Sequence, residues 1–552
     1  MNKILIIVVL FIISPLQAQN FNSIIEDLDS AIKTVPSANK EYVQTITSIQ
    51  PGVVEVTIEE ISKKGSSTVN SFEFNTADID INTIKTITKK DVIVIQLLAK
   101  NKQKLIKLTT NQEKISYVNQ LLINAENIDN GRLIEDYFKQ CVPLAQEITD
   151  KRLSLSSYQE QLNWLENNVI DVNLIKKQFS QNLAANNKYP GSIIIKSNEI
   201  AGKNSKNRTY QLNLSTLNPN SILFKITGEI FSIELETRRK LKTIKYFEDS
   251  EQKAYTNKLT IVCNSVENAR DLQKVLKDII SLSEIEFNNS LTKINSISQG
   301  VQLINSLTNK VVVNDLTITQ NIDGKCVSVF KQETLDNNNT VQETFNFNFA
   351  DFNKNGINYS TNGKQVFLEL NIKGGNNYIK YEKNGEQKNY IKSLKIYTPE
   401  IEDAITLEST LSSIINLCQN PNNSAFKAGS KSNMLQILQQ NLSKININNI
   451  TYDQSLKINE NVLIFTNTII NTKSSKEQIF EFNLSDINSN SIKMNTSGKN
   501  VTVTASTYHL EKIIKYYENG AIKNYQNEIE IQAINIENAR LITNLLVSLT
   551  EK

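Results

Sequence analysis

The chain has 552 residues, which is too long for a single hydrophobic core and predicts about three to five domains. Its content of 39% hydrophobic and 21% charged residues is typical of a folded globular protein and excludes a disordered chain. With 60 basic and 57 acidic residues the net charge is only +3, which argues against nucleic acid as a partner.

The N-terminus has the layout of a secretory signal peptide. Lys3 precedes an apolar run over 4–13, and a possible cleavage site follows at Ala18. As a helix this run would span about 15 Å, half the thickness of a bilayer core, so we expect it to be cleaved rather than retained as an anchor. We therefore predict an exported protein, periplasmic or secreted, with no transmembrane segment after the signal peptide at 1–18 is removed.

The rest of the chain consists of four copies of one unit. The phrases FEFNTADIDI, YQLNLSTLNP, FNFNFADFNK and FEFNLSDINS lie 138, 135 and 135 residues apart and begin at Phe72, Tyr210, Phe345 and Phe480. A second motif, which reads Ile-Glu-Asn-Ala-Arg in repeat 4, has its fourth residue 59 positions after each of these aromatic residues. This recurrence predicts four repeats, at 19–158, 159–286, 287–424 and 425–552.

Each repeat is predicted to belong to the α+β class, with strands first and an amphipathic helix last. In repeat 4, alternating apolar and polar residues predict six or seven short strands, at 450–458, 462–471, 480–483, 491–495, 501–506, 512–517 and 522–532. Apolar residues spaced three and four apart between Ile536 and Leu549 predict the closing helix. We expect an antiparallel meander or partly open barrel that this C-terminal helix closes.

Helices are also predicted before the strands, at 301–307 in repeat 3 and 434–442 in repeat 4. The segment 419–433 contains Pro421 and Gly429 and is the predicted flexible joint. An asparagine ends the first quoted strand of every repeat and is predicted to cap the turn that follows, because its side chain bonds the nearby backbone. These residues are Asn75, Asn213, Asn348 and Asn483.

One hairpin of each repeat allows a prediction of register. The Asn519-Gly520 pair favours a two-residue turn that places Glu518 opposite Ala521, and extrapolation then places Ile514 opposite Tyr525. The same two residue types recur in all repeats, as Ile106 and Tyr117, Ile244 and Tyr255, Ile379 and Tyr390, and Ile514 and Tyr525. An aromatic ring opposite a β-branched side chain is a favourable cross-strand contact, so packing explains the tyrosine better than ligand binding does.

Two groups of basic residues are candidates for a ligand surface. A lysine directly follows the recurring isoleucine, at Lys107, Lys245, Lys380 and Lys515, and strand alternation places it on the opposite face. It is interpreted either as a solubilising residue or as part of a charged row that binds a partner. The densest basic cluster contains Arg238, Arg239 and Lys240 and is interpreted as a solvated hairpin tip or as a contact for an anion.

The cysteines and the remaining reactive residues predict no catalytic, cofactor or metal site. Cys141, Cys263, Cys326 and Cys418 fit no zinc or redox spacing and are predicted to be buried free thiols, although export permits disulfides. The single histidine, His509, is expected in a solvated turn. Glu234 and Glu236 share a strand face and could act as paired carboxylates, but repeat 2 alone carries them. We therefore predict that the protein is not an enzyme.

About seven strands followed by one C-terminal helix resemble the pleckstrin-homology-like fold. The strand-end phrases Leu484-Ser485-Asp486-Ile487 and Ala77-Asp78-Ile79 are similar to the corresponding stretch of some bacterial members. The resemblance implies a bent, partly open barrel plugged by the helix, in a family that often binds phosphoinositides or peptides. The rival fold is a helix-grip type, in which a sheet wraps the last helix around an apolar pocket, and a shared fold does not fix function.

These features lead to three functional hypotheses. The first is an exported, non-catalytic binding or scaffold protein whose partner is an unknown protein, glycan or lipid of the cell envelope. The second is a carrier of an apolar ligand held between each sheet and its closing helix. The third, ranked well below both, is an enzyme that works through the carboxylates of repeat 2.

Overall fold

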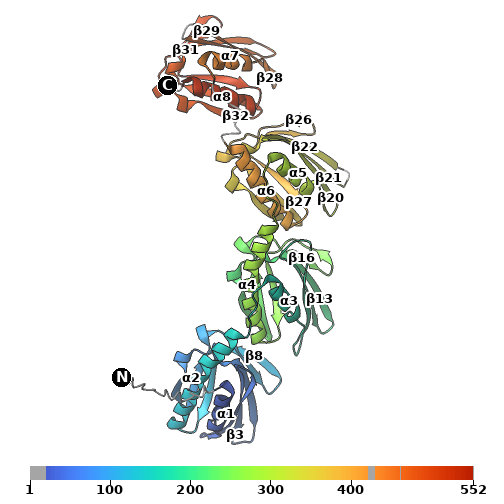
Figure 1. Cartoon of the computed structure of the whole chain (residues 1–552), viewed down its shortest axis with the longest axis vertical. Coiled ribbons are helices and arrows are strands. Elements are labelled where there is room, and N and C mark those ends of the chain that lie inside the picture. Colours follow the sequence, from blue (N-terminus) through green and yellow to red (C-terminus); the bar gives the residue numbers. More distant parts are fainter. Residues whose placement is uncertain (1–19, 338, 421–428, 460–461, 551–552) are drawn as a thin grey trace, which may run out of the picture. The chain divides into compact units, whose positions relative to one another are not determined.

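The computed structural model describes residues 20–337, 339–420, 429–459 and 462–550 (Figure 1). The predicted signal peptide and most of the predicted joint at 419–433 lie outside the described residues. The chain divides into two compact units, Met1–Asn289 and Ser290–Lys552, and each unit contains two of the repeats. No helix in the described ranges is long and apolar enough to cross a membrane.

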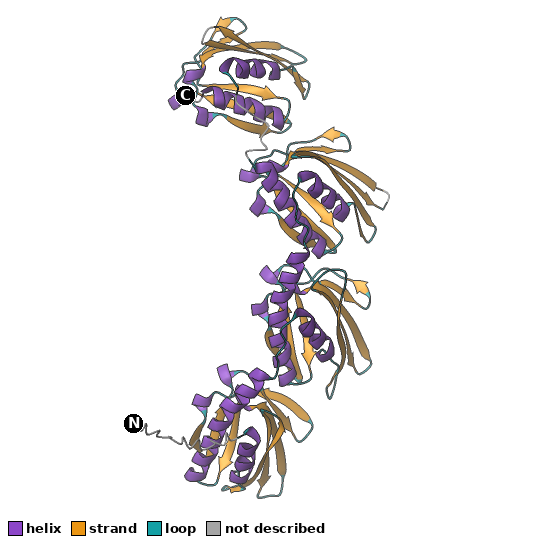
Figure 2. Ribbon diagram, viewed as in Figure 1, coloured by secondary structure: helices purple, strands orange, loops and turns teal. Residues whose placement is uncertain are grey.

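Repeat 1 contains two antiparallel sheets and two long helices (Figure 2). The opening helix is α1 (Phe21–Ala31) and the closing helix is α2 (Ile128–Lys151). The six-stranded sheet has the order β1 (Val35–Pro36), β2 (Lys40–Gln50), β3 (Val53–Ser62), β4 (Ser67–Asn75), β7 (Ile106–Thr110) and β8 (Lys114–Val118). The three-stranded sheet has the order β5 (Lys85–Lys89), β6 (Val92–Leu98) and β9 (Gln120–Ala125).

Repeat 2 has the same elements in the same order. Its helices are α3 (Tyr158–Asn168) and α4 (Val266–Ser290). The six-stranded sheet contains β10 (Val172–Asn173), β11 (Gln178–Ala185), β12 (Ser192–Ala201), β13 (Asn204–Asn213), β16 (Lys245–Glu248) and β17 (Glu251–Gln252). The three-stranded sheet contains β14 (Leu223–Thr227), β15 (Ile230–Glu236) and β18 (Lys258–Cys263).

Repeat 3 follows the same plan in the second unit. Its helices are α5 (Ile297–Thr308) and α6 (Ile401–Gln419). The six-stranded sheet contains β19 (Lys310–Val313), β20 (Leu316–Gly324), β21 (Val327–Asp336), β22 (Asn339–Asn348), β25 (Lys380–Lys383) and β26 (Glu386–Gln387). The three-stranded sheet contains β23 (Asn358–Asn362), β24 (Gln365–Asn371) and β27 (Ser393–Thr398).

Repeat 4 completes the second unit. Its helices are α7 (Lys431–Asn441) and α8 (Ile536–Thr550). The six-stranded sheet contains β28 (Ile445–Ile447), β29 (Ile450–Asn459), β30 (Val462–Ile470), β31 (Ser475–Asn483), β34 (Lys515–Glu518) and β35 (Ala521–Ile522). The three-stranded sheet contains β32 (Lys493–Ser497), β33 (Asn500–Ser506) and β36 (Glu528–Ala533).

The β-rich repeats with closing helices are thus confirmed, but their strands do not form one meander, and the sheets are not closed barrels. After β4 the chain leaves the first sheet and forms β5 and β6, then returns to pair β7 with β4, and finally pairs β9 with β6. The predicted strand at 522–532 is accordingly two strands, β35 and β36, in different sheets. These sheets do not by themselves establish a pleckstrin-homology-like fold.

The opening helix and the closing helix of a repeat pack on different sheets. Each opening helix packs on the six-stranded sheet of its repeat, as α1 does on β2. In repeats 1, 3 and 4 the closing helix contacts the three-stranded sheet, as α2 does on β5, β6 and β9. The apolar face predicted for α8 is buried from Ile536 to Leu549, which confirms that prediction.

The hairpin register is confirmed at the turn and wrong farther along the strands. Glu518 lies opposite Ala521 as predicted, but Ile514 forms its bridge with Gln526 rather than Tyr525. An extra residue between these two points shifts the second strand by one position, as a β-bulge does. In repeat 1 the tyrosine, Tyr117, lies opposite Lys107. The recurring tyrosine therefore needs another explanation.

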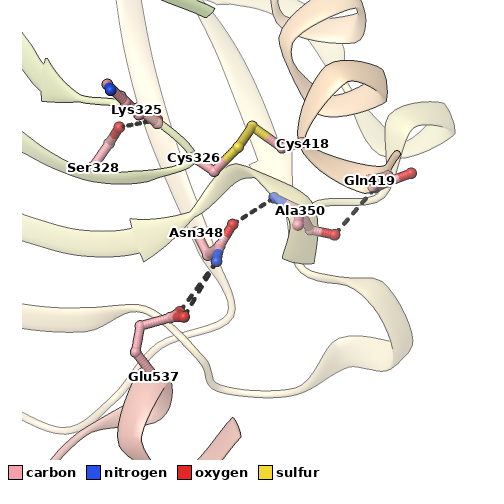
Figure 3. The surroundings of a disulfide bond; sticks show 8 residues. All are labelled: Lys325, Cys326, Ser328, Asn348, Ala350, Cys418, Gln419 and Glu537. Atoms are coloured by element: carbon pink, nitrogen blue, oxygen red, sulfur yellow. Dashed lines mark hydrogen bonds between the residues drawn. A yellow bond between two sulfur atoms is a disulfide. The ribbon is translucent and has the colours of Figure 1, made fainter. Parts of the chain in front are cut away.

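Two cysteines contradict the prediction of free thiols. Cys326 and Cys418 form a disulfide (Figure 3). Cys141 and Cys263 are buried and free. The bridge joins the residue before β21 to the last turn of α6, whose Gln419 Nε2 also donates to the backbone oxygen of Ala350 at 3.1 Å. Because no other repeat has cysteines at these positions, the repeat pattern gave no signal for this pair.

Candidate functional site

A cleft opens between the two sheets at the same place in three repeats. In repeat 1 its volume is about 370 Å³, in repeat 2 about 450 Å³ and in repeat 4 about 890 Å³. One wall comes from the six-stranded sheet and carries the first aromatic residue of the repeat motif, which is Phe72, Tyr210 or Phe480. The other wall comes from the three-stranded sheet. This position is therefore a property of the fold, and its lining differs between repeats.

The repeat 4 cleft contains side-chain oxygens that the fold leaves unsatisfied. Asn467 Oδ1, Asn500 Oδ1 and Gln532 Oε1 are buried and have no hydrogen-bond partner among the described residues, and all three residues line the cleft. A buried acceptor without a donor costs about 1–3 kcal/mol. Repeat 1 has Ile58 at the strand position of Asn467 and buries it, so the fold itself does not require an amide there.

Aromatic rings and acids complete the repeat 4 lining. Phe480 and Tyr516 lie with ring centroids 5.0 Å apart, and the Tyr516 hydroxyl donates to Glu518 at 2.8 Å. Burial raises the pKa of Tyr516, so its hydroxyl keeps its proton at neutral pH. Glu528 and Glu530 lie on the other wall, and burial followed by the neighbouring Glu528 charge raises the pKa of Glu530. This acidic wall disfavours an anionic ligand.

The repeat 2 cleft is lined by charges that already pair with each other. Glu199 accepts from Lys177 at 2.5 Å and from Arg208 at 3.0 Å, and the hydrogen bond from Lys177 is the main cause that lowers the pKa of Glu199. Lys225 pairs with Glu234 at 2.9 Å. Repeats 2 and 4 thus present chemically different clefts on one framework.

The four recurring lysines lie at equivalent positions beside acidic or polar neighbours. Lys107 pairs with Glu73 at 2.9 Å, Lys380 with Glu382 at 2.8 Å, and Lys515 with Glu481 at 3.6 Å. Lys245 lies opposite Gln211 in the corresponding pair of strands. None of the four lines the clefts of repeats 1, 2 and 4 as described. Their role as a ligand surface stays a prediction.

The basic cluster of repeat 2 is a short 3-10 turn, η6 (Arg238–Lys240), and not a hairpin tip, because the chain there passes from one sheet to the other. Arg238 donates two hydrogen bonds to Glu284 of α4, at 3.0 and 2.7 Å, and one to the backbone oxygen of Leu217. Arg239 and Lys240 are exposed. Arg238 therefore stabilises the turn against the closing helix, whereas Arg239 and Lys240 remain available to a ligand.

The residues considered for catalysis lie in ion pairs or in an exposed turn. Glu234 accepts from Lys258 and Lys225, each at 2.9 Å, and these hydrogen bonds lower its pKa, so it is not tuned as a general acid. Glu236 lies 3.9 Å from Lys258. His509 is exposed in a turn. The described part of the chain contains no group of three or more side chains that could hold a metal ion.

A polar junction that was not predicted from the sequence joins repeats 1 and 2. Arg270 at the start of α4 pairs with Asp78 in the turn η1 (Thr76–Asp78) of repeat 1, and also with Glu267 at 2.5 Å. Asn75 Nδ2 donates to Glu267 Oε2 at 3.1 Å. Arg152 contacts the same Glu267 at 3.0 Å. The side chains at the start of one closing helix thus bind the turn of the preceding repeat.

The same junction recurs between repeats 3 and 4. Arg540 of α8 donates to both carboxylate oxygens of Asp351, at 2.7 and 2.6 Å, and to Glu537 at 3.3 Å. Asn348 Nδ2 donates to Glu537 Oε1 at 3.2 Å (Figure 3). The same asparagines also cap their turns as predicted, since Asn75 accepts from the Ala77 N–H and Asn348 from the Ala350 N–H. One residue therefore serves both its own turn and the next repeat.

The recurring tyrosine belongs to this junction. The ring of Tyr117 lies 5.1 Å from Phe231 of repeat 2, and Leu105 lies in the repeat 2 core. In the second unit Tyr390 lies in the repeat 4 core and its backbone N–H donates to the Gly498 oxygen at 3.0 Å. Tyr117 and Tyr390 thus pack against the following repeat of their unit rather than only against their own hairpins.

Acidification is expected to stabilise the first junction through Asp78. Burial raises the pKa of Asp78 to about 6, although Arg270 opposes the shift. The folded pKa lies above the unfolded value, so the contribution is complete below about pH 4 and is lost as the pH rises through 6. The free energy of unfolding of wild type relative to Asp78→Asn should therefore increase by about 3 kcal/mol between pH 7 and 4. Urea unfolding followed through Trp164, the single tryptophan, checks this for repeat 2; equal pH profiles for the two proteins would contradict it.

No protein-family model matches this chain, and no curated protein matches its sequence.

Proposed function

We propose that the chain is an exported, non-catalytic binding or scaffold protein of four pleckstrin-homology-like modules, and that the inter-sheet cleft of repeat 4 holds its ligand. The observation that carries this proposal is the set of three unsatisfied oxygens, on Asn467, Asn500 and Gln532, that line one cleft. Repeat 3 has Gln332 at the position of Asn467, and its Oε1 is also buried without a partner among the described residues. What supports a ligand is therefore not one such oxygen but the gathering of three of them along one cleft.

The lining favours a neutral glycan among the partners that a cell envelope offers. The unsatisfied oxygens accept hydrogen bonds, so the ligand must present O–H or N–H donors. The acids Glu528 and Glu530 repel anionic lipid headgroups and acidic sugars. The rings of Phe480 and Tyr516 offer an apolar surface beside these polar groups, and such a mixture is typical of sites for small polar ligands.

Two further features support an exported scaffold. The disulfide between Cys326 and Cys418 suits an oxidising compartment outside the cytoplasm. The clefts of repeats 1 and 2 occupy the same place with other linings, so one chain offers several different surfaces, and linked sites can raise avidity by about 10²–10⁴. These clefts lie between two sheets rather than between a sheet and its closing helix, which favours binding at the cleft over the alternative of an apolar-ligand carrier.

The variant Asn467→Leu separates binding from folding. It removes one unsatisfied acceptor, so we expect equal or higher stability, by up to about 1 kcal/mol, together with at least tenfold weaker binding. Binding is measured on an array of neutral and acidic oligosaccharides probed with the full chain, and stability by thermal unfolding. The matched control is Gln332→Leu, at the same strand position in repeat 3, which should leave binding unchanged.

Wild-type binding to neutral oligosaccharides that Asn467→Leu abolishes would support the proposal. Binding that both variants retain, or binding confined to acidic sugars, would refute the repeat 4 site. A clear loss of stability in Asn467→Leu would show that the amide serves the fold instead.

A further inference from the structure

The junction between neighbouring repeats has two halves that differ in chemistry. The turn half contains the asparagine and aspartate of the first 3-10 turn with two apolar hairpin residues, which are Asn75, Asp78, Leu105 and Tyr117 in repeat 1. The helix half contains an apolar residue, an acid and an arginine at the start of the closing helix, which are Val266, Glu267 and Arg270 in repeat 2. Repeats 3 and 4 reproduce both halves.

The aspartate of the turn half and the arginine of the helix half can be followed through the four repeats. The aspartate position holds Asp78, Thr216, Asp351 and Asp486 in the four repeats. The arginine position holds Arg132, Arg270, Ile405 and Arg540. Repeats 1 and 4 therefore each carry one charged residue, Arg132 and Asp486, beyond those that the two described junctions use.

Repeat 1 has a complete helix half that no other repeat of its unit covers. Its apolar residue Ile128 is 52% exposed, whereas Val266 and Ile536 at the same position are 9% and 6% exposed. The side chain of Arg132 is 71% exposed, against 18% for Arg270. Arg132 pairs with Asp129 at 3.7 Å, as Arg270 pairs with Glu267, but it has no aspartate partner from another repeat among the described residues.

The turn half of repeat 4 is also complete, and its apolar residues are also exposed. Tyr525 is 46% exposed and Ile513 is 45% exposed, whereas the corresponding Tyr390 and Leu105 are 5% and 4% exposed. Asp486 forms no ion pair within the described part of the chain and accepts only weak hydrogen bonds from Asn483 at 3.5 Å and Ser485 at 3.4 Å. Asn483 makes no capping bond either, unlike Asn75 and Asn348.

We propose that the turn half of repeat 4 binds the helix half of repeat 1 in a second copy of this chain. Asp486 would pair with Arg132, and Asn483 would donate to Asp129, as the matching residues do inside each unit. Tyr525 and Ile513 would cover Ile128, because their counterparts belong to the hydrophobic core that contains the first residue of the closing helix in both described junctions. A second copy is the occupant that carries the required partner residues at the required spacing.

The two halves differ, so the contact is heterologous and joins copies head to tail. A copy bound at one end keeps its other half free, so association continues beyond a dimer unless the geometry closes a ring. This inference does not depend on the proposed ligand. It would place many copies of the repeat 4 cleft on one assembly.

Charge reversal at either end tests the proposal. Both Arg132→Glu and Asp486→Arg should weaken self-association at least tenfold, because the first variant places two negative charges opposite each other at the contact and the second places two positive charges there. A mixture of the two variants should associate again, since every contact between unlike copies restores one opposite pair. Sedimentation velocity over a wide concentration range measures all four samples, and thermal unfolding followed by circular dichroism checks that each variant is folded.

Association of wild type beyond a dimer, loss in each variant alone and recovery in the mixture would establish the contact. A wild type that stays monomeric at every concentration would overturn it, and the exposed halves would then belong to a different partner. Variants that associate as strongly as wild type would overturn it too, because the assembly would use another surface.

Discussion

Replacement of Arg270 with alanine is expected to lower the free energy of unfolding of repeat 2 by about 3 kcal/mol at pH 7. The guanidinium lies between two carboxylates, those of Asp78 and Glu267, and all three side chains are largely buried. Its removal leaves Asp78 without its ion-pair partner, and a buried carboxylate without such a partner is costly. Urea unfolding followed through Trp164 measures the change, because this tryptophan packs against the repeat 2 core.

The matched control is Arg132→Ala, which removes the same residue type from the same helix position in repeat 1. Because Trp164 reports only repeat 2, both variants are also compared by circular dichroism, at a concentration at which the chain is monomeric. The only described ion pair of Arg132, with Asp129, is highly exposed, so the expected change is below about 0.5 kcal/mol. Equal effects of the two substitutions would show that the Asp78 contact adds nothing. Arg540→Ala should repeat the large effect in the second unit, since Arg540 binds Asp351 through two hydrogen bonds.

Local features of the repeat were predictable because their causes lie close together in sequence. The apolar spacing of α8 and the Asn519-Gly520 turn both follow from a few neighbouring residues, and both were predicted correctly. The division into two sheets was not predictable in this way. The division depends on β7 pairing with β4 rather than with β6. The alternation of apolar and polar residues along β7 would be the same with either partner, so it cannot identify the pairing.

The junction escaped sequence analysis because its partners lie far apart. Arg270 and Asp78 are separated by 192 residues, and each also has a local explanation, as a helix residue and as a turn residue. The loss of the charged residue in one repeat at each of these two positions, Thr216 and Ile405, was nevertheless visible in the sequence. The interruption of the helix motif at Ile405 was the signal that could have identified it.

The cleft of repeat 4 left no comparable signal. Asn467, Asn500 and Gln532 lie on three different strands in a chain with many polar residues, and nothing in their own neighbourhoods distinguishes them. They stand out only when burial is known, since an amide that water solvates needs no partner. The predicted lysines, in contrast, were found by their recurrence, and Lys107, Lys380 and Lys515 bind acids beside them.

Replacement of both Cys326 and Cys418 with serine is expected to lower the free energy of unfolding of repeat 3 by about 3–4 kcal/mol. The bridge closes a loop with a sequence separation of 92 residues, which contains most of both sheets and the closing helix. Its main effect is to restrict the unfolded chain, and this effect grows with loop length. Hydrogen exchange of peptides from β21 to α6, read by mass spectrometry, should show faster exchange in the variant.

A reducing agent provides the decisive comparison for this disulfide. Wild type in reductant should exchange like the double variant, whereas the variant itself should not respond, because burial raises the pKa of Cys141 and Cys263 to about 12 and keeps these thiols inert. Exchange in repeat 4 should change less, since the remaining junction contacts of Asp351 and Tyr390 do not involve the bridge. Identical exchange of wild type with and without reductant would mean that repeat 3 folds as well in a reducing compartment, and the disulfide would then no longer support export.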